Sequence, residues 1–191
     1  MWMVRVSRGS MLKKKTVVAT EETEQVERGM LAWLWVALVV VALDQLTKWM
    51  AESTLVEVGN YVEVFPHLNW KLAYNYGAAF SIFGDQNGWQ VWFFAILAIV
   101  VSAFIINWLR KLRKTSVVAA TGLVLVLGGA IGNLIDRLLY GKVIDFIDVY
   151  FDIPLVMDNY HFATFNVADI AITVGAVILV FLSLFDEGAM E

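Results

Sequence analysis

The chain has 191 residues, of which 60% are hydrophobic and only 17% are charged, and its formal net charge is −4. Soluble domains carry about 25% charged residues. This composition, with a mean hydropathy of +0.69, therefore indicates an integral membrane protein. The mild acidity leaves no basic face for a phosphate backbone, which argues against nucleic acid as a partner. Cysteine is absent, which excludes disulfides, thiolate metal sites and a cysteine nucleophile.

Residues 1–29 are polar and mixed in charge, with three lysines at 13–15 followed by four glutamates between 21 and 27. We interpret them as a flexible cytoplasmic tail, with Met11 or Met30 as alternative starts. The first apolar run continues into Asp44 and Lys48 with no A-x-A-like site at its end. That pattern argues against a cleaved signal peptide.

Four apolar runs predict four membrane-spanning helices, at about 31–50, 89–109, 117–139 and 162–185. Each approaches the ~20 residues needed to cross a bilayer. Basic residues gather at 110–114 and in the tail, so the positive-inside rule places both termini in the cytoplasm, with an inverted or dual topology as the alternative. We expect residues 30–187 to form a single four-helix domain.

The first outer connection predicts a small β-structure. Between positions 56 and 64, valines alternate with polar or small residues, and Gly59-Asn60 lies between the two halves as a turn would. This pattern is typical of a short β-hairpin, and we expect an outer β region at about 54–83. Farther along, Gly77 begins a Gly-Ala-Ala segment that allows close main-chain approach. The predicted fold class is thus four transmembrane helices with a small extracytoplasmic sheet.

Two aspartates lie beside apolar runs near the same predicted interface. Asp145 follows Val143-Ile144, and Asp169 follows Val167-Ala168. Placing an ionisable group at membrane depth costs free energy, so an aspartate found there is a candidate functional residue. Two close carboxylates can share one proton, which lets one activate a water while the other polarises an amide. The residues therefore predict an aspartyl catalytic pair.

Other polar residues receive simpler interpretations. We expect Asp136 to be ion-paired with its neighbour Arg137 in a structural role. Three further aspartates, Asp148, Asp152 and Asp158, are interpreted as solvated loop acids, because their spacing is not that of a calcium-binding loop. Two histidines, His67 and His161, are interpreted as surface or packing residues. No motif indicates a zinc, serine or nucleotide enzyme, so no metal or cofactor is predicted.

The same residues allow other interpretations. A single aspartate at the end of a membrane span is more often a helix cap or an interfacial group than a catalytic residue. A small transporter or proton-relay protein would use the same acids, and inverted repeats between the halves would favour it. A purely structural membrane protein leaves unexplained why acids and asparagines gather at one depth.

Four segments together resemble the signature blocks of bacterial lipoprotein signal peptidase, or signal peptidase II: LDQLTK (43–48), LAYNYGAAFSIF (72–83), GGAIGNLIDRLLYGKVIDFID (128–148) and FATFNVADIAITVGA (162–176). The resemblance extends in order from Trp33 to Leu184. It implies an aspartyl endopeptidase of the bacterial inner membrane, with four transmembrane helices, an outer β-cradle and a small periplasmic helix. We expect the protein to be a monomer. Its implied substrates are diacylglyceryl-modified prolipoproteins, cut just before the lipidated cysteine near the extracytoplasmic face, and its implied inhibitor is globomycin.

The resemblance also implies roles for individual residues. The catalytic pair falls on Asp145 and Asp169. Four polar residues correspond to the substrate groove, namely Asn75, Asn133, Arg137 and Asn166. Structural support falls on Asp44 and Lys48, whose i, i+4 spacing allows an ion pair, and on Asp136 and Gly77. The connection between the catalytic aspartates is longer than usual for the family, which leaves the shape of the outer rim open.

Overall fold

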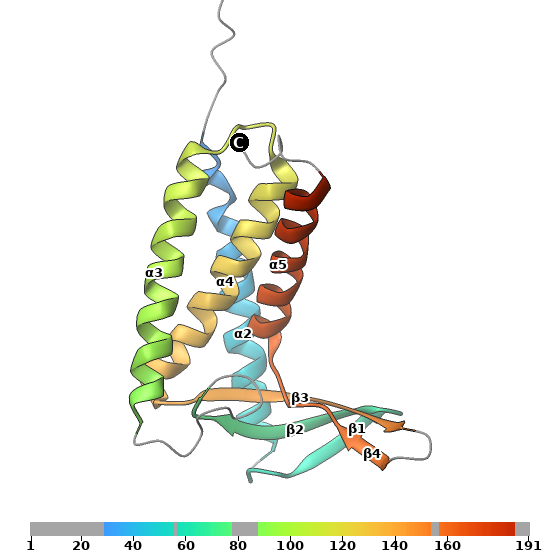
Figure 1. Cartoon of the computed structure of the whole chain (residues 1–191). Helices are drawn as coiled ribbons and strands as arrows, with labels where there is room; N and C mark the ends of the chain where they lie inside the picture. The colour runs from blue at the N-terminus through green and yellow to red at the C-terminus, as the bar shows by residue number, and fades with distance from the viewer. Residues whose placement is uncertain (1–28, 56, 78–87, 154–156, 186–191) are drawn as a thin grey trace, which may run out of the picture.

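The structure is a computed structural model that describes residues 29–55, 57–77, 88–153 and 157–185. Its described part contains a bundle of four long helices with a sheet across one end (Figure 1). A short 3-10 helix, η1 (Leu31–Trp33), leads into α2 (Leu34–Thr54), and the other helices are α3 (Trp89–Lys111), α4 (Val117–Tyr140) and α5 (Val167–Phe185). Four helical stretches are long and apolar enough to cross a membrane. The predicted four-helix membrane architecture is confirmed.

Helix α4 lies at the centre of the bundle and packs against α2, α3 and α5. Small residues allow this close packing. A Cβ added to Gly128 would lie 2.7 Å from the Cβ of Val40 in α2, and a Cβ added to Gly129 would collide with the carbonyl oxygen of Ala168 in α5. Gly128 and Gly132 have the small-x-x-x-small spacing that indicates a helix-packing face in membrane sequences, and the structure places α2 and α5 against this face.

The outer surface of the bundle is apolar. Large hydrophobic side chains are exposed along α2, α3 and α5, including Leu38, Trp49, Ile96, Val100, Val177 and Leu184. Apolar surface of this extent in long helices is expected where the neighbour is lipid. Helices α2, α3 and α5 therefore surround α4 and direct their apolar side chains outward, where they can contact lipid.

The sheet has the strand order β1-β2-β3-β4 and is antiparallel throughout. Its strands are β1 (Tyr61–Phe65), β2 (Leu68–Asn75), β3 (Val143–Ile153) and β4 (Met157–His161). The sheet therefore joins the connection after α2 to the connection after α4. In the β2–β3 register, Ala73 lies opposite Asp145 and Asn69 lies opposite Asp148.

A hairpin is present in the predicted outer β region, but it is not the predicted one, because residues 57–58 are not a strand and Gly59-Asn60 is not its turn. Strands β1 and β2 are joined at Pro66-His67, where His67 takes a positive φ of 72°. Gly59-Asn60 instead forms a turn before β1, because the Gly59 amide donates to the Leu72 carbonyl and the Leu72 amide donates to the Asn60 carbonyl. The hydrophobic alternation thus predicted a strand correctly and misplaced its turn.

The second outer connection contains strands β3 and β4, which lie outside the β region predicted at about 54–83. The predicted fourth span also starts too early, because α5 begins at Val167 and residues 162–166 are not helical. Phe165 pairs with Ile147 as an isolated bridge, so this segment belongs to the sheet edge. Among the described residues, no small outer helix such as the resemblance implies is present.

The end of the bundle opposite the sheet carries the connection between α3 and α4 (Figure 1). The described chain begins and ends at this same end, and the amides of Gly29 and Met30 donate to the carbonyls of Leu112 and Leu109, each at 2.8 Å. The basic cluster at 110–114 therefore lies far from the sheet. Of the predicted tail at residues 1–29, all but Gly29 is outside the described residues.

Candidate active site

The first turn of α5 is fixed by a reciprocal capping arrangement. Asn166 precedes the helix, and its Oδ1 accepts from the Asp169 amide at 2.9 Å, while Asp169 Oδ2 accepts from the Asn166 amide at 3.3 Å. This is the capping box, in which cap and N3 side chains each satisfy the other's main-chain donor. The Asn-x-x-Asp spacing therefore places Asp169 in the first turn of α5.

Asp145 reaches the same place from the sheet. Its side chain is 3% exposed, and its Oδ1 accepts from Asn166 Nδ2 at 2.7 Å. The Asn166 side chain is thus bound to Asp145 through its nitrogen and to the Asp169 amide through its oxygen. One buried asparagine therefore links the two aspartates of the predicted pair.

The environment of Asp145, on β3 and outside the spanning helices, favours its protonated form. Burial raises its pKa to about 7, and the adjacent negative charge of Asp169 acts in the same direction. Hydrogen bonds from Asn75 and Asn166 oppose this shift without cancelling it. Near neutral pH the site can therefore hold one carboxylic acid beside a second carboxylate.

Asn133 of α4 orients Asp169. Its Nδ2 donates to Asp169 Oδ1 at 2.8 Å, and its Oδ1 accepts from Asn166 Nδ2 at 3.1 Å and from Lys48 Nζ at 3.0 Å. The cation at Lys48 can bond only to the amide oxygen, which fixes the amide nitrogen toward Asp169. A charge-assisted contact from α2 thus sets the orientation of a group that contacts the candidate catalytic acid.

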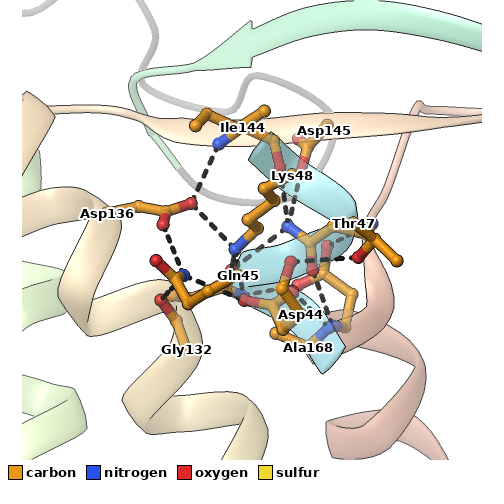
Figure 2. A network of polar contacts seen from close by, with 12 residues as sticks. Asp44, Gln45, Thr47, Lys48, Gly132, Asp136, Ile144, Asp145 and Ala168 are labelled. Atoms are coloured by element: carbon orange, nitrogen blue, oxygen red, sulfur yellow. Dashed lines mark hydrogen bonds and ion pairs between the residues drawn. The ribbon is translucent and has the colours of Figure 1, made fainter. Parts of the chain in front are cut away.

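Lys48 is the centre of a buried network between α2, α4 and the sheet (Figure 2). Its Nζ lies 2.8 Å from Asp44 Oδ2 and 2.8 Å from Asp136 Oδ2. Asp44 also accepts from the Ala168 amide at 2.9 Å, and Asp136 accepts from the Ile144 amide at 3.1 Å. These amides precede Asp169 and Asp145 by one residue each. The network therefore holds the main chain on which both aspartates are mounted.

Two expectations about this network are resolved by the structure. The ion pair between Asp44 and Lys48 is present. Asp136 is ion-paired as expected, but its partner is Lys48 rather than Arg137. Helical geometry explains this outcome, because consecutive residues point to different sides of a helix and cannot face one partner. Gln45 Nε2 also donates to Asp136 Oδ1 at 2.9 Å, a contact that no sequence motif discussed above predicted.

Arg137 connects α4 to the first outer connection. Its Nη2 donates to the Gly77 carbonyl at 3.4 Å, its Nη1 donates to the Asn133 carbonyl at 3.2 Å, and its guanidinium lies 5.3 Å from the centre of the Phe94 ring. Gly77 is held in turn, because its amide donates to Asn75 Oδ1 at 3.0 Å. Arg137 therefore stands between Gly77 and the residues around Asp169.

A pocket of about 580 Å³ opens beside Asp169, between α4, α5 and the extended segment before α5. Its polar wall contains Asn75, Asn133, Arg137 and Asp169, and its remaining walls are largely apolar, with Val143, Phe162, Ala163, Thr164, Phe165, Ile170, Ile172, Thr173 and Val174. A pocket with one polar wall and apolar surroundings suits a ligand that is itself partly embedded in lipid.

Comparisons with known proteins show the family of the chain. A family model described as "Signal peptidase (SPase) II" matches residues 36–185. The chain belongs to the signal peptidase II family. It is 48% identical over 163 residues to a lipoprotein signal peptidase of Pseudomonas putida, which covers 85% of this chain and 92% of that protein. It is also 48% identical over 146 residues to one of Hydrogenovibrio crunogenus, covering 76% and 81%.

A solved structure shows the same fold. A bacterial membrane enzyme determined at 2.3 Å resolution by the in meso method is 31% identical, with a TM-score of 0.71 over 86% of this chain and 94% of that chain. The family assignment expected from the sequence motifs is confirmed, and it makes the chain a peptidase. Among the described residues of this signal peptidase II, no group of three or more acidic, histidine or cysteine side chains could hold a metal ion.

The structure corrects the interpretation of Asp148. Its side chain is 0% exposed and accepts from Asn69 Nδ2 at 2.9 Å, and His161 Nδ1 lies 2.8 Å from its Oδ2. It is therefore a buried sheet residue and not a solvated loop acid. The sequence signal was its place on the β3 face shared with buried Phe146, which only the pairing of β2 with β3 makes visible. The side chains of Asp152 and Asp158 are outside the described residues.

His161 and His67 make the packing contacts expected of them. His161 stacks on Tyr150 with ring centres 5.3 Å apart, and the His67 ring centre lies 5.4 Å from that of Tyr150 on the strand beside it. The bond from His161 to Asp148 is additional to that expectation. These residues stabilise the sheet away from the pocket.

Proposed function

We propose that Asp145 and Asp169 are the catalytic pair of this peptidase, and that it removes the signal peptide from diacylglyceryl-modified prolipoproteins just before the lipidated cysteine. The observation that carries the proposal is the linkage of two carboxylates through Asn166, with the pKa of one raised to about 7 beside the other. The relatives named lipoprotein signal peptidase support the choice of substrate.

The geometry assigns different roles to the two acids. Asp169 accepts from Asn133 and lines the pocket, which places its carboxylate to take a proton from a water. Asp145 carries the proton and donates it toward the carbonyl oxygen of the scissile amide. The water oxygen then bonds to the carbonyl carbon. The tetrahedral species breaks at the C–N bond, with the proton on Asp169 passing to the leaving nitrogen and the proton on Asp145 restored from the diol.

The pocket suits a substrate that remains anchored in lipid. Its apolar walls lie beside the exposed face of α5, where Val174 and Val177 are open to the surroundings. Two acyl chains on the cysteine would stay in the bilayer and limit where the scissile bond can lie, which is a proximity effect. Arg137, Asn75 and Asn133 would then bind the peptide portion at the polar wall.

The charge distribution supports an orientation. The basic cluster at 110–114 lies at the opposite end of the bundle from the sheet. Cytoplasmic connections carry the excess of Lys and Arg, so both termini face the cytoplasm and the pocket lies near the extracytoplasmic face of the bacterial inner membrane. The enzyme works as a monomer, without metal, cofactor or nucleic acid.

The direct test is cleavage of a purified, diacylglyceryl-modified precursor by the purified full chain, with and without globomycin, followed by gel shift. Wild-type protein should release the signal peptide and globomycin should block the release. Asp145→Asn and Asp169→Asn should each abolish the shift while inserting normally, and Glu63→Gln, at an exposed position of β1, should not. Substantial cleavage by either aspartate variant would remove that residue from the catalytic pair.

A further inference from the structure

The segment between β4 and α5 forms one wall of the pocket and runs beside β3. Its two ends are bonded to that strand. The Phe162 amide donates to the Val149 carbonyl at 2.7 Å, the Phe165 amide donates to the Ile147 carbonyl at 3.0 Å, and the Phe165 carbonyl accepts from the Ile147 amide at 2.8 Å. The segment is therefore held as an edge of the sheet without being a full strand.

Between these ends, Ala163 and Thr164 lie opposite a single residue of β3, Asp148. Two residues facing one is the arrangement of a β-bulge, which redirects the groups of the bulged chain. In extended chain the main-chain groups of successive residues point to opposite edges. Phe162 and Phe165 both turn theirs toward β3 although they are three residues apart, so the alternation is broken at Ala163 and Thr164, and neither of these two residues bonds to β3.

Ala163 and Thr164 have no main-chain hydrogen bond to any described residue. Both are partly buried, and both line the pocket that contains Asp169. Unpaired main-chain donors and acceptors are costly where water is scarce, and near a bilayer they occur only where they face a cavity or a ligand. An extended peptide is a ligand that supplies matching groups at regular spacing.

We propose that the main chain of Ala163 and Thr164 binds the substrate by strand addition, so that the peptide beside the scissile bond lies extended along this edge. The inference rests on the proposed function. It explains how one enzyme can position peptides of different sequence, since main-chain pairing reads no side chain. Thr164 is a positioning residue in this account, and it acts through its amide rather than its hydroxyl.

The test uses two matched changes on the enzyme and one series on the substrate. Thr164→Pro removes the amide donor, whereas Thr164→Val removes the hydroxyl and keeps the donor. In synthetic diacylglyceryl-modified peptides, single residues other than the one at the scissile bond are replaced by their α-hydroxy acids, which exchanges one N–H for an oxygen. Loss of one hydrogen bond corresponds to roughly 3- to 10-fold in kcat/KM.

We expect the kcat/KM of Thr164→Pro to be roughly 3- to 10-fold below that of Thr164→Val, mainly through a higher KM. With wild-type enzyme, at least one ester-containing peptide should show a similar loss of kcat/KM. Equal values for the two variants would overturn the proposal, even if an ester-containing peptide is a poorer substrate, because the peptide would then pair elsewhere. If thermal unfolding shows that Thr164→Pro does not fold, Ala163→Pro replaces it. Failure of wild-type enzyme to cleave the parent peptide would instead reject the proposed function, and this inference with it.

Discussion

Replacing Lys48 with methionine removes the cation from the buried network and should destabilise the protein strongly. Lys48 is 1% exposed, and its partners Asp44 and Asp136 are each 0% exposed. Methionine fills a similar volume but leaves two carboxylates facing each other without the cation that lies 2.8 Å from each. Removing one partner of a buried ion pair costs about 3–5 kcal/mol.

The same change should lower activity by a separate route. Lys48 Nζ donates to Asn133 Oδ1 at 3.0 Å, and without it the Asn133 amide can rotate away from Asp169. The triple variant Asp44→Asn, Asp136→Asn, Lys48→Met carries no buried charge in this network. It should recover part of the lost stability but not the activity, because the contact that orients Asn133 is still missing.

The assay is the free energy of unfolding in detergent micelles, measured beside cleavage of the lipidated precursor. Lys71→Met, on β2 and only partly buried, serves as the matched control and should change stability by less than about 0.5 kcal/mol. A Lys48→Met protein within about 1 kcal/mol of wild type would refute the assignment of Lys48 as the centre of the network. Full activity in the triple variant would refute its action through Asn133.

Three further outcomes are expected. Because burial raises the pKa of Asp145 from 3.8 to about 7, the stability of the wild-type protein should fall as pH rises from about 4 to 7. In denaturation measurements at pH 8, Asp145→Asn should be more stable than wild type by up to about 4 kcal/mol. Equal stability at that pH would contradict the raised pKa. Arg137→Ala should lower kcat/KM on the lipidated precursor at least 10-fold by releasing the Gly77 carbonyl, and normal turnover would reduce Arg137 to a surface role. Gly129→Val should lower the melting temperature by several degrees, since its Cβ would collide with the Ala168 carbonyl, whereas an unchanged value would show that α5 can shift freely.

Features within single helices could be predicted from the sequence. Long apolar runs predicted four helices, glycine spacing predicted the close packing of α4, and the i, i+4 spacing of Asp44 and Lys48 predicted their ion pair. Each of these depends on residues close in the chain. The periodicities of helices and the length of a bilayer crossing are local constraints, so sequence alone expresses them.

Features that depend on strand pairing were harder to predict. Strands β3 and β4 were missed because their aspartates made the segment resemble a solvated connection, whereas β2 supplies the partners that bury Asp148. The start of α5 was placed too early because Phe162 and Ala163 are apolar. The better signal was the capping pair Asn166 and Asp169, whose spacing fits only a helix that begins between them.

Residue-specific carbon NMR of Asp145 across pH, in the wild-type protein and in Asp169→Asn, tests most directly whether the two carboxylates act as a pair. The signal reports whether the Asp145 side chain carries a proton. With Asp169 ionised beside it, Asp145 should remain protonated up to about pH 7, and Asp169→Asn should lower that midpoint because the adjacent negative charge is gone. An Asp145 that is already ionised at pH 5, or whose midpoint is unaffected by Asp169→Asn, would contradict a shared proton.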